Sequence, residues 1–226
     1  MKKCLVLVVV LALVGMVFGV EPAKPAKAPE PTMKMAAGSA KIIVEPVVKE
    51  FTAMKAAIAL EKAAAYAPKE GYAKDQAGIS LAYSSMAKDG FDKLMKWCHA
   101  TSTWPSGPGF MVCNEDPSVT ETAKLTTKIG FPVKGDAKGD SIVTIEEVPA
   151  MTAAMLQYQG PYEDANNAWT TIMNWMKTNN CEPAGPPLEV YLKGPMDVKD
   201  PKEYLTEIRF PVKKPEAKKA EEAPKK

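Results

Sequence analysis

The pattern of apolar and polar residues occurs twice along this chain. The segment Ile-Gly-Phe-Pro-Val at residues 129–133 recurs as Ile-Arg-Phe-Pro-Val at residues 208–212, which is 79 residues later. Upstream features recur at a spacing of 78 residues, namely Trp97 with Trp175 and the Gly-Pro pair at 107–108 with that at 185–186. An internal repeat decides the architecture of a chain. We therefore expect two diverged copies, about 42–133 and 142–213, that form one pseudo-symmetric domain with a central cleft.

Each copy is predicted to contain one amphipathic helix. Apolar residues recur at three- and four-residue intervals within residues 86–100 and 162–178, which is typical of a helix with one buried face. The stripes are Phe91, Leu94, Met95 and Cys98 in the first copy and Ala165, Trp169, Ile172, Met173 and Met176 in the second. Core packing is the expected role of both stripes.

A Pro/Gly-rich loop follows each predicted helix and interrupts it, at residues 105–109 and 182–187. Short apolar segments after the loops predict two hairpins, 110–113 with 120–132 and 188–193 with 204–211. Each copy then reads strand, helix, strand, strand. The predicted fold class is α+β, with the helices covering one face of the sheet.

The first copy is longer before its helix. Aligning Val48 with Val148 leaves about 22 additional residues there. Their alanine-rich part, residues 58–67, favours a short helix, which we expect to pack on one side of the domain.

Both ends of the chain differ from the repeats in composition. Two lysines followed by an apolar run at residues 5–18 are typical of a secretory signal, so we expect residues 1–19 to be cleaved and the protein to be exported, to the periplasm or outside the cell. An uncleaved membrane anchor is the alternative. Residues 20–41 and 214–226 consist mainly of Pro, Ala, Lys and Glu, which predicts a flexible linker and a disordered charged tail.

Charge and cysteine content narrow the function classes. A net charge of +2 lacks the strongly basic character of a nucleic-acid-binding domain. Cys98 and Cys113 are a candidate disulfide in an exported protein, and buried free thiols, Cys181 included, are the alternative. His99 is the only histidine, so a metal site or cofactor is not expected.

Strand alternation predicts one sheet face without helical cover. On that basis Leu188, Val190 and Leu192 point toward the helices. The open face collects Glu189, Tyr191, Glu207 and Arg209, with Met111, Cys113 and Lys128 from the first copy. Such a face is either ordinary solvated sheet or a binding groove.

The second copy also resembles a known family. The motif Tyr-Gln-Gly-Pro-Tyr at residues 158–162, the tryptophans, Gly185-Pro186 ahead of Glu189-Val-Tyr, and the final strand are together similar to the GyrI-like effector-binding domain, over about residues 42–213. The resemblance implies two strand-helix-strand-strand repeats around a cleft that binds hydrophobic, often cationic, molecules. It places the family's buried acidic residue at Glu207, with Tyr191 and Tyr162 lining the site. The alternative for Glu207 is a surface ion pair with Arg209 or Lys128. Lys128 opposite Glu207 would shift the preference toward neutral or zwitterionic molecules.

Three functions remain open at this point. The leading one is an exported stand-alone binding protein for a small amphipathic molecule, without nucleic acid as a partner. The second is a hydrolase of small electrophilic compounds, in which Glu207 or Glu189 acts as base and Tyr191 as proton donor. The third is haem or tetrapyrrole binding through His99, which the similarity to the SOUL fold suggests. Binding is preferred over catalysis, and the sequence does not indicate the ligand or the oligomeric state.

Overall fold

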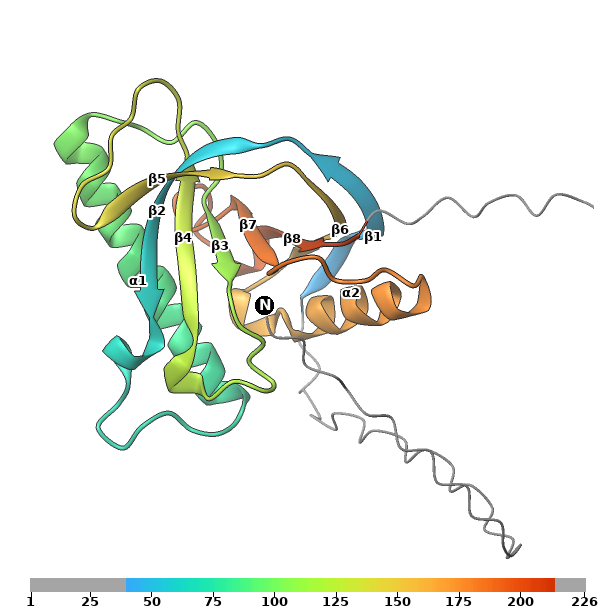
Figure 1. Ribbon diagram of the computed structural model, residues 1–226. Helices are drawn as coiled ribbons and strands as arrows, with labels where there is room; N and C mark the ends of the chain where they lie inside the picture. Colours follow the sequence, from blue (N-terminus) through green and yellow to red (C-terminus); the bar gives the residue numbers. More distant parts are fainter. Residues whose placement is uncertain (1–39, 214–226) are drawn as a thin grey trace, which may run out of the picture. The chain divides into compact units, whose positions relative to one another are not determined.

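Eight strands and two α-helices make up the part of the chain that this computed structural model describes, residues 40–213 (Figure 1). The strands are β1 (Lys41–Phe51), β2 (Met54–Lys62), β3 (Phe110–Cys113), β4 (Thr126–Pro132), β5 (Val143–Val148), β6 (Met151–Gln159), β7 (Leu188–Lys193) and β8 (Leu205–Pro211). The helices are α1 (Gln76–Thr101) and α2 (Asn166–Thr178). The predicted α+β class is confirmed. The predicted signal segment and charged tail lie outside the described residues, as does nearly all of the predicted linker.

All strands join one antiparallel sheet in the order β1-β6-β8-β7-β3-β4-β2-β5. The order is symmetric about its centre. Each strand of the first half, β1, β2, β3 or β4, has its counterpart β5, β6, β7 or β8 at the same distance from the opposite edge. The two predicted hairpins are present, as β3 with β4 and β7 with β8. The centre of the sheet lies between β3 and β7, where Met111 pairs with Glu189. Both halves therefore meet at Glu189. Superposition of the two halves remains a prediction.

A long two-stranded ribbon joins the outer parts of the sheet. Phe51 at the end of β1 pairs with Met151, and Met54 at the start of β2 pairs with Val148. The same antiparallel register thus continues from β1–β6 into β2–β5. In Figure 1 this ribbon arches past β3, β7 and β8.

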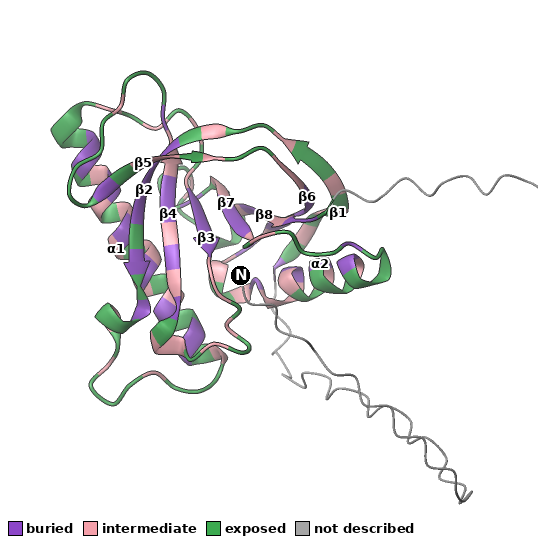
Figure 2. Ribbon diagram, in the orientation of Figure 1, coloured by how far each residue is buried: buried purple, intermediate pink, exposed green. Residues whose placement is uncertain are grey.

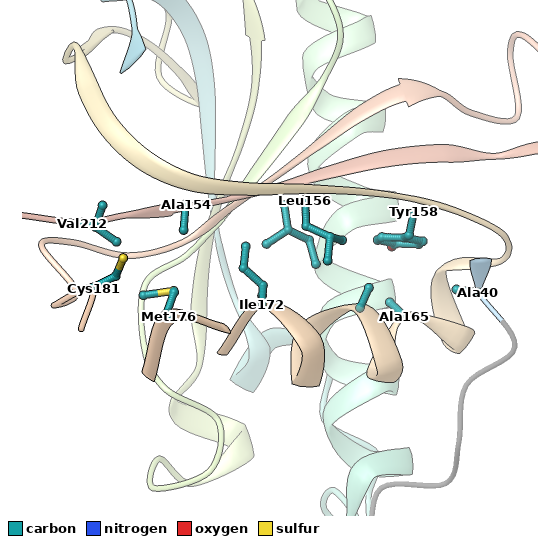
Figure 3. Packing of buried hydrophobic residues seen from close by; sticks show 11 residues of the cluster. Ala40, Ala154, Leu156, Tyr158, Ala165, Ile172, Met176, Cys181 and Val212 are labelled. Carbon is teal, nitrogen blue, oxygen red and sulfur yellow. The ribbon is translucent and has the colours of Figure 1, made fainter. Parts of the chain in front are cut away.

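The helices cover one face of the sheet. α1 begins at the N-cap Asp75, whose carboxylate accepts from the backbone N–H of Ala77 and Gly78, and it ends at Ser102 in the left-handed conformation. α2 packs its buried residues Ala168, Ile172 and Met176 in one cluster with Leu156 of β6 and Ile208 of β8. Figure 3 shows Ile172 facing Leu156 across this cluster. Among residues 40–213, neither helix has the length and apolar character needed to cross a membrane.

The other face of the sheet is also buried at its centre, although no helix residue contributes to its cluster. Its buried members are Ala56, Ile58, Phe110, Val112, Leu188 and Val190. Met54, Val148 and Met151, from the bend of the ribbon, pack against them. Buried residues consequently line both sides of the central strands, which are largely purple in Figure 2.

Two predictions about the first half are wrong. Residues 58–62 belong to strand β2, and only one 3-10 turn, Ala63–Tyr66, follows them where a short helix was expected. The alignment of Val48 with Val148 is also incorrect. β2 and β6 have nine residues each and begin at Met54 and Met151, so Phe51 is the counterpart of Val148.

The three cysteines in the described residues are free and buried. Cys98 and Cys113 lie in one cluster under α1, and the disulfide considered from the sequence is not formed. The alternative prediction, three buried free thiols, is confirmed for the described residues.

Candidate functional site

A buried glutamate, Glu189, lies at the centre of the helix-covered face. It sits on β7, and only 8% of the residue is exposed. Trp169 Nε1 of α2 donates to Glu189 Oε1 at 2.9 Å, and Tyr191 Oη donates to Glu189 Oε2 at 3.1 Å. Each carboxylate oxygen therefore accepts one hydrogen bond from an aromatic side chain. Along the sheet the neighbours of Glu189 are Met111 on β3 and Ile208 on β8.

Aromatic rings form the surroundings of this carboxylate. Tyr191 makes an edge-to-face contact with Phe91 of α1, with centroids 5.8 Å apart, and another with Tyr162, at 5.2 Å. Tyr162 stacks on Tyr204 at 5.0 Å. Edge-to-face and offset stacked pairs are the favoured geometries for aromatic rings. We call Glu189, Tyr191, Trp169, Phe91 and Tyr162 the Glu189 cluster, which receives side chains from both helices.

Burial shapes the electrostatics of the cluster. Desolvation raises the pKa of Glu189 above its ordinary value, and the hydrogen bonds from Trp169 and Tyr191 offset part of this effect. Desolvation also raises the pKa of Tyr191, with a further contribution from the charge of Glu189. Tyr191 is therefore a neutral hydrogen-bond donor to Glu189 at neutral pH.

The structure divides the residues predicted for the open face between the two faces. Residues paired across antiparallel strands share a face, and Glu189 pairs with Ile208 while Glu207 pairs with Val190. Glu189, Tyr191, Met111 and Cys113 therefore lie on the helix side, together with Tyr162. Leu188, Val190 and Leu192 belong to the cluster on the opposite side. The prediction that these three leucine and valine residues point toward the helices is wrong.

Glu207 lies on the face away from the helices and is 5% exposed. It accepts from Gln157 Nε2 at 2.7 Å and from Arg209 Nε at 2.6 Å, and the Arg209 guanidinium lies 4.0 Å above the Phe51 ring. The carboxylate of Glu207 is thus already paired with a cation. It does not share a face with Tyr191, contrary to the predicted arrangement.

Lys128 is paired with a glutamate other than Glu189 and Glu207. Its Nζ lies 2.6 Å from Glu146 Oε2, in an ion pair at the partly exposed end of the sheet. Lys128 was predicted to lie opposite Glu207, and it does share the face of Glu207, but it faces away from Glu189 and its ion pair is with Glu146.

Some members of the cluster were not recognised as site residues from the sequence. Trp169 and Phe91 were assigned to the core stripes of their helices, and they do pack there, but their inner edges also contact the site. The buried Thr206 is the strand neighbour of Tyr191, and the buried Tyr158 lies on the other side of Thr206. The motif at residues 158–162, which contains Tyr158 and Tyr162, was the sequence feature that could have indicated Tyr158.

His99 lies away from this cluster. It is exposed at the end of α1, and its ring contacts Trp104 edge-to-face at 5.0 Å. A depression of about 480 Å³ near this end of α1 is lined by Trp104, Lys134 and Lys138, among others. A second depression, of about 530 Å³, lies along α1 beside Tyr66 and Asp89. Neither of these two includes Glu189.

Two solved structures share the fold. The EcmrR chain in its complex with DNA superposes with a TM-score of 0.59 at 20% identity, covering 75% of this chain and 57% of that chain. The EcmrR C-terminal domain gives a TM-score of 0.56 at 19% identity, covering 76% of this chain and 99% of that domain. This chain therefore spans a little over half of the EcmrR chain in the DNA complex. At these identities the likeness concerns the fold alone.

The family comparison covers most of the described domain. The comparison with curated proteins gives no match. A family model described as the GyrI-like small molecule binding domain matches residues 60–213, which include β3 to β8, both helices and every residue of the Glu189 cluster. The chain belongs to the GyrI-like family of small molecule binding domains.

Proposed function

We propose that the protein binds a small hydrophobic cation at the Glu189 cluster, between the two helices and the centre of the sheet. The observation that carries the proposal is a buried carboxylate held by Trp169 and Tyr191 among aromatic rings. The family description, a small molecule binding domain, supports ligand binding in general. The acidic residue in this proposal is Glu189 in place of Glu207.

The physical argument is that the site favours a cation over water. An ionised carboxylate without a cationic partner is costly to bury, and the raised pKa of Glu189 expresses this cost. A cation beside Glu189 would stabilise the charged form. The rings of Tyr191, Phe91 and Tyr162 would add cation–π contacts, each about 0.5 to 2 kcal/mol. Because these rings now pack on one another, binding requires some of them to move apart.

A titration with a matched pair of dyes tests the proposal. One dye is an aromatic cation and the other a neutral molecule of similar shape, and each is titrated into the wild type, Glu189→Gln and Glu207→Gln by fluorescence or calorimetry. We expect Glu189→Gln to weaken the cation by roughly 1 to 3 kcal/mol, the scale of a hydrogen bond to a charged group, and to leave the neutral dye nearly unchanged. Glu207→Gln is the control on the opposite face and should change neither.

The opposite result would identify a different site. If Glu207→Gln weakens the cation and Glu189→Gln does not, the acidic residue is the one that the sequence resemblance indicated, on the face away from the helices. Tyr191→Ala separates ring contact from charge, and we expect it to weaken both dyes. If neither dye binds the wild type, the proposed function is wrong.

Hydrolysis of a small electrophile is a second candidate function. One observation favours it, the hydrogen bond between the hydroxyl of Tyr191 and the carboxylate of Glu189, since such a pair can activate water and protonate a leaving group. Consumption of an epoxide by the wild type, with none by Glu189→Gln, would support this role. Binding without turnover would reject it.

We also propose that binding takes place outside the cytoplasm. The lysines and apolar run at the start of the chain support export. N-terminal sequencing of the mature protein should find a chain that begins near Val20. Recovery of Met1 from a cytoplasmic fraction would contradict export without affecting the binding site.

A further inference from the structure

The buried acidic residues within residues 40–213 differ in their cationic partners. They are Glu61, Glu189 and Glu207. Lys93 Nζ of α1 lies 2.9 Å from Glu61 Oε2. Arg209 Nε lies 2.6 Å from Glu207 Oε1. The donors to Glu189 are the neutral side chains of Trp169 and Tyr191. Among these buried acids of the described chain, Glu189 is therefore the one that the chain does not neutralise.

Met111 is the neighbour of Glu189 at the centre of the sheet. β3 and β7 lie side by side there (Figure 1), and Met111 pairs with Glu189 in antiparallel register. Residues paired in this way share a face. β3 and β7 are also counterparts in the symmetric strand order. The centre of the site thus carries a carboxylate from one half and an uncharged thioether from the other.

The surroundings of Met111 are apolar. Cys113 lies two residues further along β3, so it shares the face of Met111 at a distance of about 7 Å along the strand. Both residues belong to one buried cluster, against which Phe91 and Tyr191 pack. Because Phe91 and Tyr191 also contact each other edge-to-face, this apolar cluster adjoins the Glu189 cluster. Methionine is flexible and polarisable, which suits contact with varied apolar groups.

One further acid, Glu115, acts on this side of the site. Burial raises the pKa of Cys113, the charge of Glu189 adds to this effect, and Glu115 makes a smaller contribution. Glu115 follows the end of β3 and is half-buried. Its two carboxylate oxygens accept from the backbone N–H and the hydroxyl of Thr126, at 2.6 and 2.7 Å. The charge of Glu115 is thus stabilised at the end of the strand by Thr126.

We propose that the ligand carries a single positive charge at one end, beside Glu189, and an uncharged apolar part that lies on Met111 and Cys113. This inference rests on the function proposed above and adds the charge and the form of the ligand. A second charge at the far end would lie among apolar side chains without a partner, which is costly. The site therefore selects monocations over dications of the same size.

Two probes of equal size test the inference. One is 4-propylbenzylamine, which has one ammonium group at neutral pH. The other is 4-(2-aminoethyl)benzylamine, in which a second ammonium group replaces the terminal methyl. We expect the wild type to bind the monoamine at least about tenfold more tightly in calorimetric titrations. Because the second ammonium group is also better hydrated in water, a variant is needed to locate the effect.

Cys113→Asp places an acid beside the apolar end of the ligand. It should reduce the preference for the monoamine at least about tenfold, because the second ammonium group then has a partner. Cys113→Asn has the same shape without the charge, and it should not reproduce this change. Thermal unfolding of both variants shows whether they fold.

A photoreactive probe gives a measurement on the wild type. In this probe a diazirine replaces the terminal methyl of 4-propylbenzylamine, and mass spectrometry locates the cross-link after illumination. We expect cross-links on β3, at Met111 or Cys113, or on Phe91 of α1. An excess of 4-propylbenzylamine should suppress them. If Cys113→Asp does not fold, the position of the cross-link decides.

The outcomes separate this inference from the proposed function. Equal affinity of the wild type for the two probes, an unchanged preference in a folded Cys113→Asp variant, or cross-links confined to α2 and β6 would overturn the single-charge inference and leave cation binding at Glu189 intact. Absence of binding of both probes by the wild type would overturn the proposed function, and this inference with it.

Discussion

At the scale of a single residue, burial of the Glu189 side chain carries an energetic cost. Its carboxylate accepts hydrogen bonds from Trp169 and Tyr191, but burial still raises its pKa. A fully compensated carboxylate would have a normal or lowered pKa. Burial therefore favours the protonated form of Glu189, which agrees with the proposal that the charged form awaits a cationic partner.

The pH dependence of stability should reveal this cost. The folded-state pKa of Glu189 lies above the ordinary 4.5, so between the two values the folded protein retains a proton that the unfolded chain has lost. The free energy of unfolding must then fall as the pH rises from about 4.5 through the folded-state pKa. We expect Glu189→Gln to lack this decrease. In urea unfolding it should match the wild type near pH 4 and exceed it at pH 7.

Glu207→Gln is the control for this measurement. The carboxylate of Glu207 is paired with Arg209, so its removal leaves a largely buried cation without a partner and should destabilise the protein at pH 7. If both variants lose stability equally at pH 7, burial does not penalise the charge of Glu189.

Trp169 should tune the acid to which it donates. Trp169→Phe removes the N–H that bonds to Glu189 Oε1, so the pKa of Glu189 should rise further, because a hydrogen bond to the charged form lowers it. The affinity for an aromatic cation at pH 7 should fall by roughly 1 to 3 kcal/mol, and the pH below which binding is lost should move upward. The measurement is a binding titration repeated across pH.

Trp97 provides the control for this substitution. Its indole also donates from a helix, to the carbonyl of Lys138 at 3.3 Å. Trp97→Phe should lower stability without shifting the pH dependence of binding. A similar shift for both variants would mean that Trp169 acts through packing alone.

Sequence analysis found part of this site and misplaced the rest. Glu189, Tyr191, Tyr162 and Met111 were all candidates, and the structure places them together. Alternation along β7 separates its two sets of side chains, but both faces of β7 are buried. The apolar set, Leu188, Val190 and Leu192, was therefore assigned to the helix side. Periodicity cannot assign a face when the ribbon covers one side and the helices cover the other.

At the scale of elements, the alanine-rich segment shows tertiary structure overriding propensity. Alanine favours helix, but Ala56, Ala57 and Ala59 are fully buried within β2. Ala57 and Ala59 lie in the cluster under α1, where their small side chains allow the helix to pack close to the sheet. The start of α1 was predicted ten residues too late, at Met86 instead of Gln76. The N-cap Asp75 and the buried Ile79 and Ala82 were the overlooked signals.

Gly90 lies where α1 packs tightly against Ile129 of β4. A Cβ at this position would lie 2.5 Å from Ile129 Cγ1, well inside van der Waals contact. Gly90→Ala gains about 1 kcal/mol of helix propensity, but overpacking costs about 1 to 3 kcal/mol, so we expect a net loss of up to about 2 kcal/mol in urea unfolding.

Ser84→Ala, on the exposed side of the same helix, is the matched control. It should change stability by less than about 0.5 kcal/mol. A gain in stability from Gly90→Ala would contradict the close packing of α1 on β4.

At the scale of the whole domain, the repeat predicted much of the topology but not the pairing of the outer strands. Two strand-helix-strand-strand units were expected, whereas each half has two strands before its helix, β1 and β2 or β5 and β6, so one strand in each half was missed. The ribbon that carries β1 onto β6 and β5 onto β2 depends on contacts about 100 residues apart in sequence, which no local pattern encodes. It also connects each half of the domain to the other at the sheet edges.

The ribbon leads to a prediction about where the folding unit begins. The family match starts at residue 60, but β1 pairs with the whole length of β6, and Ile42 and Val48 pack against the α2 cluster. A chain that begins at Met54 should therefore lose this packing and expose the edge of β6. We expect a lower urea midpoint and self-association on size-exclusion chromatography, because an unpaired strand edge pairs with other chains.

A chain that begins at Met35 is the control, since it retains β1 together with Ala40, whose carbonyl accepts from Asn167 of α2. It should remain as stable as the full-length protein and show no added association. The two truncations remove the same preceding residues, 1–34, so any difference between them belongs to residues 35–53 and chiefly to β1. If the chain that begins at Met54 is equally stable and bears no new tendency to associate, β1 is an accessory strand, and the matched residues 60–213 already contain the complete core that holds the Glu189 cluster together.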